Sequence, residues 1–114
     1  MAEMRALTMY FSQFDGTGKR WEDVEPYFAA VFAPDVEIIT VTKEGSTPVG
    51  YQEWADFLKA SLERKADIHM TRLEKVDEGI QYTASLMYPD RDPIVFSSLA
   101  VFKDGKMVKI SPLH

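Results

Sequence analysis

The second half of the chain is a run of extended segments separated by short glycine-containing turns, and this pattern constrains the fold more than any other feature. Asp104-Gly105 has the composition of a tight hairpin turn, and Asp77-Glu78-Gly79 separates two segments rich in β-branched and aromatic residues. The expected strands cover 68–76, 80–88, 94–103 and 106–110. Because strands joined by such turns pair in opposite directions, the sequence predicts four antiparallel strands here.

The first half of the chain shows helical spacing of apolar residues instead. Pro26 is compatible with a regular helix that begins near Glu25, and Ala33-Pro34-Asp35 is expected to end that helix. The β-branched run 36–43 predicts one further strand, which breaks at Glu44-Gly45-Ser46. Three stripes recur at the helical period: Met4, Leu7, Phe11 and Phe14; Trp21, Val24 and Phe28; and Trp54, Phe57, Leu58, Ser61 and Leu62.

The order helix, helix, strand, helix and meander predicts an α+β domain, with three helices from the N-terminal half packed on an antiparallel sheet. A chain of 114 residues suits one domain spanning 1–114. No apolar run approaches the ~20 residues of a membrane span, and the first ten residues lack the apolar core of a signal peptide. We therefore expect a cytoplasmic protein with no membrane partner.

The charged residues limit the classes of partner and site. Thirteen basic and 18 acidic residues give a net charge of −5 with no basic run, which disfavours a nucleic-acid partner. The absence of cysteine excludes thiolate nucleophiles and thiolate metal ligands. The charged segment 89–93, bracketed by prolines, is expected to be a solvated loop. We expect neither a metal nor a cofactor.

The segment DGTGK, residues 15–19, resembles a phosphate-binding loop in composition but not in context. A Walker A loop needs a glycine where Gln13 stands, a serine or threonine where Arg20 stands, and a preceding strand. Here the preceding residues have helical spacing instead. Gly16 and Gly18 are suited to a turn between two helices, because glycine adopts positive φ at no steric cost. We predict a plain connection that binds no nucleotide.

The segment IVFSSLAVF, residues 94–102, is apolar on both faces of the predicted strand. A sheet with one wet face shows alternation of apolar and polar residues, so a second apolar face needs cover. The outward set contains Val95, Leu99 and Val101. In a chain this short, the simplest cover is a second copy, and we expect a homodimer through the convex face of the sheet.

The order and spacing of these elements resemble the NTF2-like superfamily, in particular its SnoaL-like and ketosteroid-isomerase-like branch, over essentially the whole chain. The resemblance implies a cone-shaped, cystatin-like fold, a mostly apolar pocket at the wide end of the cone, and dimerisation through the convex side of the sheet. It implies no single chemistry, because this scaffold hosts isomerases, cyclases, dehydratases, hydrolases and binding modules. The segments that carry it are Trp21-Glu22-Asp23-Val24, residues 31–37, Gly50 and residues 101–108.

The isomerase branch can be compared with this sequence position by position. Its enolate-stabilising tyrosine corresponds to Tyr10, and its protonated aspartic acid would fall near Ser98. Its carboxylate base lies late in the first strand, where this sequence has Thr40-Val41-Thr42. Since neither threonine nor valine can accept a substrate proton at neutral pH, the sequence argues against steroid-type isomerisation.

Other candidate catalytic groups lie elsewhere in the sequence. His69, on an expected strand, and Glu37 are candidate acids or bases, and Asp15 is a further carboxylate that could face a pocket. His114 is the terminal residue and could belong to a purification tag, so we expect no role for it in the fold. One histidine without cysteines cannot form a histidine-rich zinc or iron site.

Aromatic residues are abundant and could form either a core or the wall of a cavity. Two hypotheses of function follow. The first is a non-catalytic dimeric module that binds a small hydrophobic ligand or a peptide. The second is a SnoaL-like enzyme that transfers protons on a hydrophobic carbonyl compound, with Tyr10 as donor and His69 or Glu37 as acid or base. The candidate ligand-binding residues are Tyr10, Phe14, Phe28, Trp54, Tyr82, Phe96 and Ser98.

Overall fold

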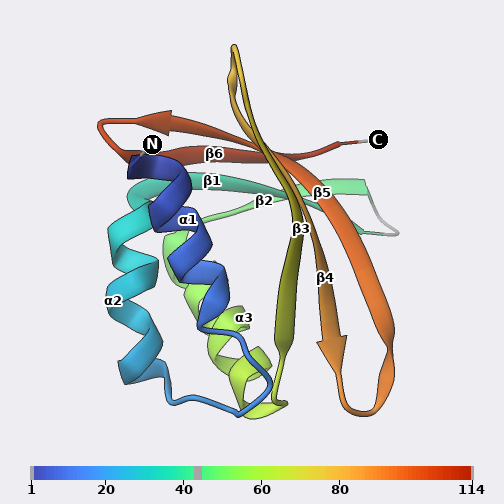
Figure 1. Cartoon of the computed structure of the whole chain (residues 1–114). Coiled ribbons are helices and arrows are strands. Elements are labelled where there is room, and N and C mark those ends of the chain that lie inside the picture. Colours follow the sequence, from blue (N-terminus) through green and yellow to red (C-terminus); the bar gives the residue numbers. More distant parts are fainter. Residues whose placement is uncertain (1, 43–44, 114) are drawn as a thin grey trace.

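The computed structural model describes residues 2–42 and 45–113 and has three helices on the concave face of a curved six-stranded sheet (Figure 1). The helices are α1 (Ala2–Ser12), α2 (Trp21–Val31) and α3 (Tyr51–Glu63). The strands are β1 (Phe32–Thr42), β2 (Gly45–Val49), β3 (Asp67–Val76), β4 (Gly79–Tyr88), β5 (Arg91–Lys103) and β6 (Lys106–Pro112). Among the described residues, no helix is long and apolar enough to cross a membrane.

The strand order in the sheet is β2-β1-β6-β5-β4-β3. The hairpins β3–β4 and β5–β6 are antiparallel, as their turn sequences predict. The expectation of a purely antiparallel sheet is wrong at one position, because β1 pairs with β6 in parallel. These two strands are joined through a helix and four other strands, so no tight turn imposes an antiparallel direction on them.

Several boundaries also differ from the sequence expectation. β1 begins at Phe32 and contains Pro34, where its pairing with β6 is irregular, and a proline is tolerated at such a position. The break expected at 44–46 falls partly outside the described residues, and Gly45 already begins β2, a short strand that the sequence did not predict. The loop expected at 89–93 is shorter, because β5 begins at Arg91, which pairs with Tyr88.

Helix α2 begins at Trp21, four residues before the predicted start, and includes Pro26. Proline removes one backbone donor from a helix, so the first turn must be stabilised otherwise. Glu22 and Asp23 lie in that turn, where carboxylates interact favourably with the positive end of the helix dipole. Val24 and Phe28 on the inner face are fully buried, and this burial anchors the helix to the sheet.

The two faces of β5 differ in burial. Phe96 and Ser98 point to the interior, and Ala100 on the same face is fully buried. On the outer face, Ser97 hydrogen-bonds across to Thr83 of β4 at 2.8 Å, and Val95 is 67% exposed. The concave face therefore supplies the core, and the convex face of this single chain keeps apolar side chains in contact with water.

Candidate functional site

A cavity of about 180 Å³ lies between helices α1 and α3 and the concave face of the sheet. Its wall is mainly aliphatic and aromatic, with two tyrosines, two serines, a threonine and a tryptophan as the polar members. Among the described residues, none that lines it is Asp, Glu, Lys, Arg or His. The cavity is therefore a neutral environment with a few hydroxyl groups, and its polarity depends on how those groups are oriented.

Tyr10 projects from α1 into the cavity wall and is 2% exposed. Its ring lies edge-on to Phe32, with ring centroids 5.2 Å apart. Trp54 lines the same cavity and is close enough to affect the phenol. Burial, with a smaller contribution from neighbouring Tyr82, raises the pKa of Tyr10 well above its usual range, and Trp54 only partly opposes this. The phenol is thus neutral and keeps its proton as a donor.

Tyr82 of β4 faces the same space and is 5% exposed. It lies directly across from Ser98 of β5 in the antiparallel pairing. Burial raises the pKa of Tyr82 to about 12, against the lowering effect of Ser98. A second neutral phenol with its own proton therefore lies close to the first.

The cavity reaches solvent beside α3. Trp54 and Phe57 stack with their ring centroids 4.9 Å apart, and both line the cavity. Phe57 is 46% exposed, which is unusual for a large aromatic residue, and Ile39 and Thr40 of β1 also line the wall. The aromatic pair therefore forms part of a mouth through which an apolar molecule could enter.

Five of the seven predicted ligand-binding residues line this cavity: Tyr10, Trp54, Tyr82, Phe96 and Ser98. Phe28 does not, because it is fully buried and stacks on Phe32 with ring centroids 4.3 Å apart. Phe14 does not either, since it lies just after the end of α1, is 1% exposed and lines a separate groove. Helical periodicity predicts that such residues are buried, but it cannot predict where packing leaves a space.

The predicted acids and bases lie outside the cavity. Glu37 is exposed on β1, between the buried neighbours Val36 and Ile38. His69 has a 62% exposed side chain, and its Nε2 atom lies 2.9 Å from Oδ1 of Asp67. This imidazole–carboxylate pair borders the surface groove between α1 and β3, not the cavity. Among the described residues, no group of three His, Cys, Asp or Glu side chains could hold a metal ion.

Residues that the sequence did not single out also form the cavity wall. Ser61 of α3 is 5% exposed, accepts a hydrogen bond from the Tyr88 hydroxyl at 3.1 Å and donates to the Phe57 carbonyl at 3.0 Å. A serine within the apolar stripe of a helix is the one sequence signal for it, because a buried hydroxyl needs partners. The other unpredicted wall residues are aliphatic or aromatic and carry no such signal.

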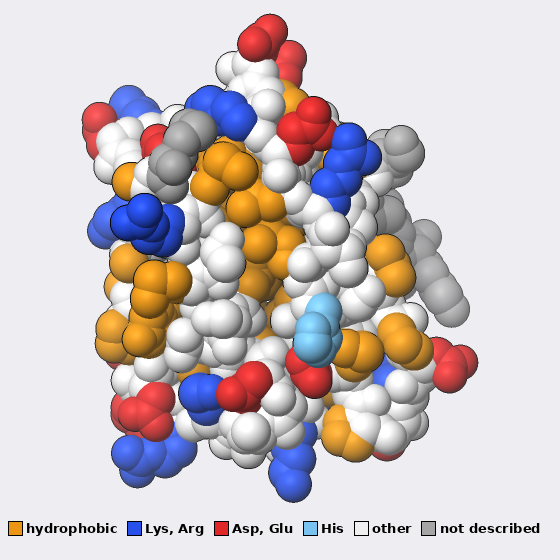
Figure 2. All heavy atoms as spheres, viewed as in Figure 1, with side chains coloured by type: hydrophobic (Ala, Val, Ile, Leu, Met, Phe, Trp, Pro, Cys, Tyr) orange, Lys and Arg blue, Asp and Glu red, His pale blue; other side chains and the backbone are white. Residues whose placement is uncertain are grey.

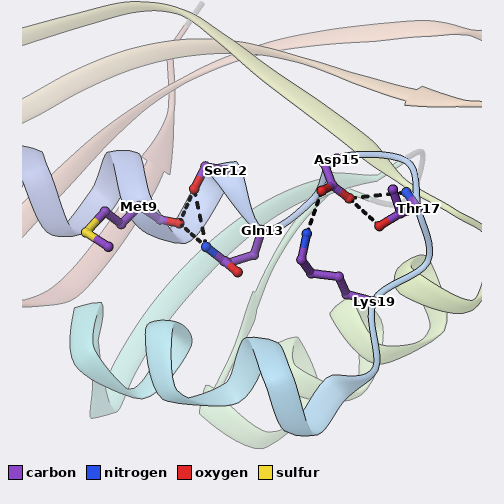
Figure 3. A network of polar contacts seen from close by, with 6 residues as sticks. All are labelled: Met9, Ser12, Gln13, Asp15, Thr17 and Lys19. Atoms are coloured by element: carbon purple, nitrogen blue, oxygen red, sulfur yellow. Dashed lines mark hydrogen bonds and ion pairs between the residues drawn. The ribbon is translucent and has the colours of Figure 1, made fainter.

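The DGTGK turn connects α1 to α2 and is closed by its own side chains (Figure 3). The Asp15 carboxylate accepts hydrogen bonds from the Thr17 hydroxyl at 2.6 Å, from the Thr17 backbone N–H at 3.2 Å and from Lys19 Nζ at 2.5 Å. Lys19, followed by Thr17, holds the pKa of Asp15 well below its usual range. Gly16 and Gly18 have φ of 82° and 74°, as a turn requires.

Comparisons with known proteins give similarity in structure but not in sequence. No family model matches the chain, and no curated protein matches it. An uncharacterised cystatin-fold protein from Novosphingobium aromaticivorans superimposes with a TM-score of 0.73 at 13% identity, over 100% of this chain and 99% of that one. The architecture described above, three helices on the concave side of a curved sheet, is consistent with this superposition. This chain has the NTF2-like fold.

Other solved structures with this fold carry different activities in their names. A candidate SnoaL-like polyketide cyclase from Jannaschia sp. CCS1 has a TM-score of 0.67 at 12% identity, over 98% of this chain and 84% of that one. An LEH-like epoxide hydrolase from M. tuberculosis has a TM-score of 0.69 at 12% identity, over 97% of this chain and 76% of that one. At these identities the NTF2-like fold is shared, and the chemistry must be argued from the site.

Proposed function

We propose that this NTF2-like domain binds a small, uncharged, mainly apolar ligand in the cavity between α1, α3 and the sheet. The observation that supports this most directly is the absence of charged side chains among the described wall residues. An ionic ligand would lose its hydration there without gaining an opposite charge. The cavity of about 180 Å³ is close in size to apolar protein cavities of ~150 Å³ that bind benzene, so the buried part of the ligand is about one ring.

The hydroxyl groups define the polarity of the ligand. Burial raises the pKa of both Tyr10 and Tyr82, so each phenol keeps a proton to donate. A ligand oxygen that accepts hydrogen bonds, such as that of a ketone, an aldehyde or an ether, complements these donors.

The alternative is a SnoaL-like enzyme acting on a hydrophobic carbonyl compound. Neutral phenols beside a carbonyl oxygen stabilise negative charge that develops there, which favours this alternative. Proton transfer also needs a base in contact with the substrate, and His69 and Glu37 lie outside the cavity. We therefore favour binding without catalysis, and turnover of a bound ketone would reverse this preference.

A series of three one-ring probes tests the proposal by calorimetry and thermal shift. Acetophenone presents an acceptor oxygen, ethylbenzene has no oxygen, and benzoate carries a charge. We expect binding in the order acetophenone, then ethylbenzene, with none for benzoate. A probe at ~100 times its Kd should stabilise the fold by about 2.7 kcal/mol.

Two adjacent serines provide a matched control. Ser98→Leu places an isobutyl group in the cavity, whereas Ser97→Leu places it on the outer face of β5. Acetophenone binding should be lost in the first variant and retained in the second. Equal loss in both variants, or stronger binding of benzoate than of acetophenone, would reject the cavity as the binding site.

We further propose that the convex face of the sheet forms a homodimer interface. Val95 is 67% exposed, and Leu99 and Val101 on the same face are only partly covered. Association would remove this apolar surface from water. Sedimentation of the wild type should give a dimer at micromolar concentration, and Leu99→Lys should shift it toward monomer. A wild type that already sediments as a monomer would contradict this proposal.

A further inference from the structure

A second hollow, a groove of about 320 Å³, lies on the surface between α1 and β3. Its floor is apolar, with Phe14 and Met70, and one end carries the Asp67–His69 pair. Figure 2 shows hydrophobic side chains gathered along the space between α1 and β3, with charged side chains around it. Phe14 and Met70 do not line the inner cavity.

Two side chains line both the groove and the inner cavity: Phe11 of α1 and Ile68 of β3. Phe11 is 6% exposed and is held by two aromatic neighbours, Tyr10 with ring centroids 5.0 Å apart and Tyr82 with ring centroids 5.2 Å apart. At the end of α1, the backbones of the two elements are joined by the Ile68 N–H, which donates to the Phe14 carbonyl at 2.8 Å. Next to this hydrogen bond, the side chains of Phe11 and Ile68 separate the groove from the inner cavity.

We propose that Phe11, with Ile68, is a partition that limits how far a ligand bound at the phenols can extend toward the groove. This inference rests on the proposed function, since it concerns the same cavity. With the phenyl ring in place, the inner cavity ends at Phe11 and accommodates about one ring beside Tyr10 and Tyr82. Without the ring, the inner cavity and the groove become one continuous space from the phenols to the Asp67–His69 pair.

The two ends of that joined space differ in chemistry, which identifies the longer ligand that would fit it. The inner end offers the phenol donors of Tyr10 and Tyr82 and so binds an acceptor oxygen. The outer end is apolar at Phe14 and Met70, and its rim carries the carboxylates of Asp15 and Asp67 together with His69, near solvent. An elongated two-ring ketone, with its carbonyl oxygen inward and its second ring over Phe14 and Met70, matches this arrangement.

The test compares acetophenone with 4-acetylbiphenyl, which carries the same ketone on two linear rings. Wild type should bind acetophenone and bind 4-acetylbiphenyl at least tenfold more weakly. Phe11→Ala should increase affinity for 4-acetylbiphenyl at least tenfold and change that for acetophenone by only a fewfold. Phe14→Ala is the matched control, because it removes an equally buried ring that lines the groove alone. It should not admit the two-ring probe to the cavity.

A second variant keeps the proposal testable if Phe11→Ala does not fold. Ile68→Ala shortens the other half of the partition at a less buried position, and it should also increase affinity for 4-acetylbiphenyl. If acetophenone binds every folded variant but 4-acetylbiphenyl gains nothing in Phe11→Ala or Ile68→Ala, the partition is refuted and the proposed function survives. If wild type binds no acetophenone, the proposed function itself fails. Tight binding of 4-acetylbiphenyl to wild type would also refute the partition.

Discussion

Several aromatic rings lie beneath α2, and several others lie beneath α3. Beneath α2 the rings pack against one another, whereas beneath α3 they line a cavity. Beneath α2, Phe28 is surrounded by Trp21, Phe32 and Tyr51, with ring centroids 4.3 to 5.5 Å apart. Beneath α3, Trp54 and Phe57 stack on each other and leave a cavity between themselves and the sheet. Both regions are rich in aromatic residues, so whether a cavity forms depends on which side chains the rings contact.

The largest loss of folding stability is expected when a ring is removed beneath α2, where the aromatic side chains pack closely. Phe28→Ala should lower the free energy of unfolding by about 3 to 5 kcal/mol, because it removes a fully buried ring and leaves a new cavity. Phe57→Ala, at the half-exposed mouth, should lower it by less than about 1 kcal/mol. Urea denaturation of both variants measures the difference. Equal losses would mean that the two regions are packed alike.

A charge introduced into the cavity beneath α3 should have the next largest effect on folding stability. Ser98→Asp places a carboxyl group in the neutral cavity wall, where burial raises its pKa above the unfolded value of ~3.9. The folded state then holds the proton more tightly, so the penalty is absent below that unfolded value and grows as pH rises. At pH 7 we expect a loss of about 3 kcal/mol. Urea denaturation at several pH values measures this.

The control for the buried charge is Ser97→Asp, on the outer face of the same strand. At a protein concentration low enough to keep the chain monomeric, its carboxyl group is near solvent, so its effect on stability should be smaller and should depend less on pH. A loss for Ser98→Asp that is the same at pH 4 and pH 7 would show that the inserted carboxyl group is hydrated, and would contradict a dry cavity.

A more modest effect is expected from a single phenol donor. Tyr10→Phe keeps the ring and removes the hydroxyl, so the affinity for acetophenone should fall by about 0.5 to 1.5 kcal/mol. The affinity for ethylbenzene should not change, because it has no oxygen to accept the bond. Calorimetry with both probes measures this. An equal loss for the two probes would assign Tyr10 to packing alone.

The smallest effect is expected at the surface turn. Lys19→Ala removes an exposed ion pair and should change the free energy of unfolding by no more than about 0.5 kcal/mol. Lys19 helps to keep the pKa of Asp15 low, so the small stabilisation from this pair is present above ~pH 3.9 and is lost as pH falls. Neither wild type nor variant should bind ATP in calorimetry. ATP affinity that is lost in Lys19→Ala would overturn our interpretation of the turn.

Local sequence signals predicted the parts of the fold that local chemistry determines. The Asp104-Gly105 turn and the apolar stripe of α3 were sufficient for a hairpin and a helix. The short strand β2 and the parallel pairing of β1 with β6 were missed, because each depends on a partner distant in sequence or on a strand too short to show alternation. Pro26 was misleading, since tertiary burial of Phe28 outweighs the lost donor.

The candidate site could be predicted only in part. Tyr10, Tyr82 and Ser98 combine burial with a polar tip, and the structure brings them to one cavity. Phe14 and Phe28 have the same periodicity as true wall residues, but neighbouring rings fill the space around them. Whether a buried ring faces another side chain or an empty volume depends on the spacing of helices above the sheet, which no local pattern encodes.

The position of β6 has a consequence for the order of folding. This strand is the last in chain order, yet it lies between β1 and β5 and joins the two parts of the sheet. During synthesis, β1–β2 and β3–β4–β5 can each form as antiparallel units, but their open edges meet only after residues 106–112 have emerged. Because the sheet is completed only when β6 pairs with β1, a strand far away in sequence, folding is slowed. Until then the edges of β1 and β5 stay unpaired and exposed. A ribosome-bound intermediate with an incomplete sheet is the expected vulnerable species.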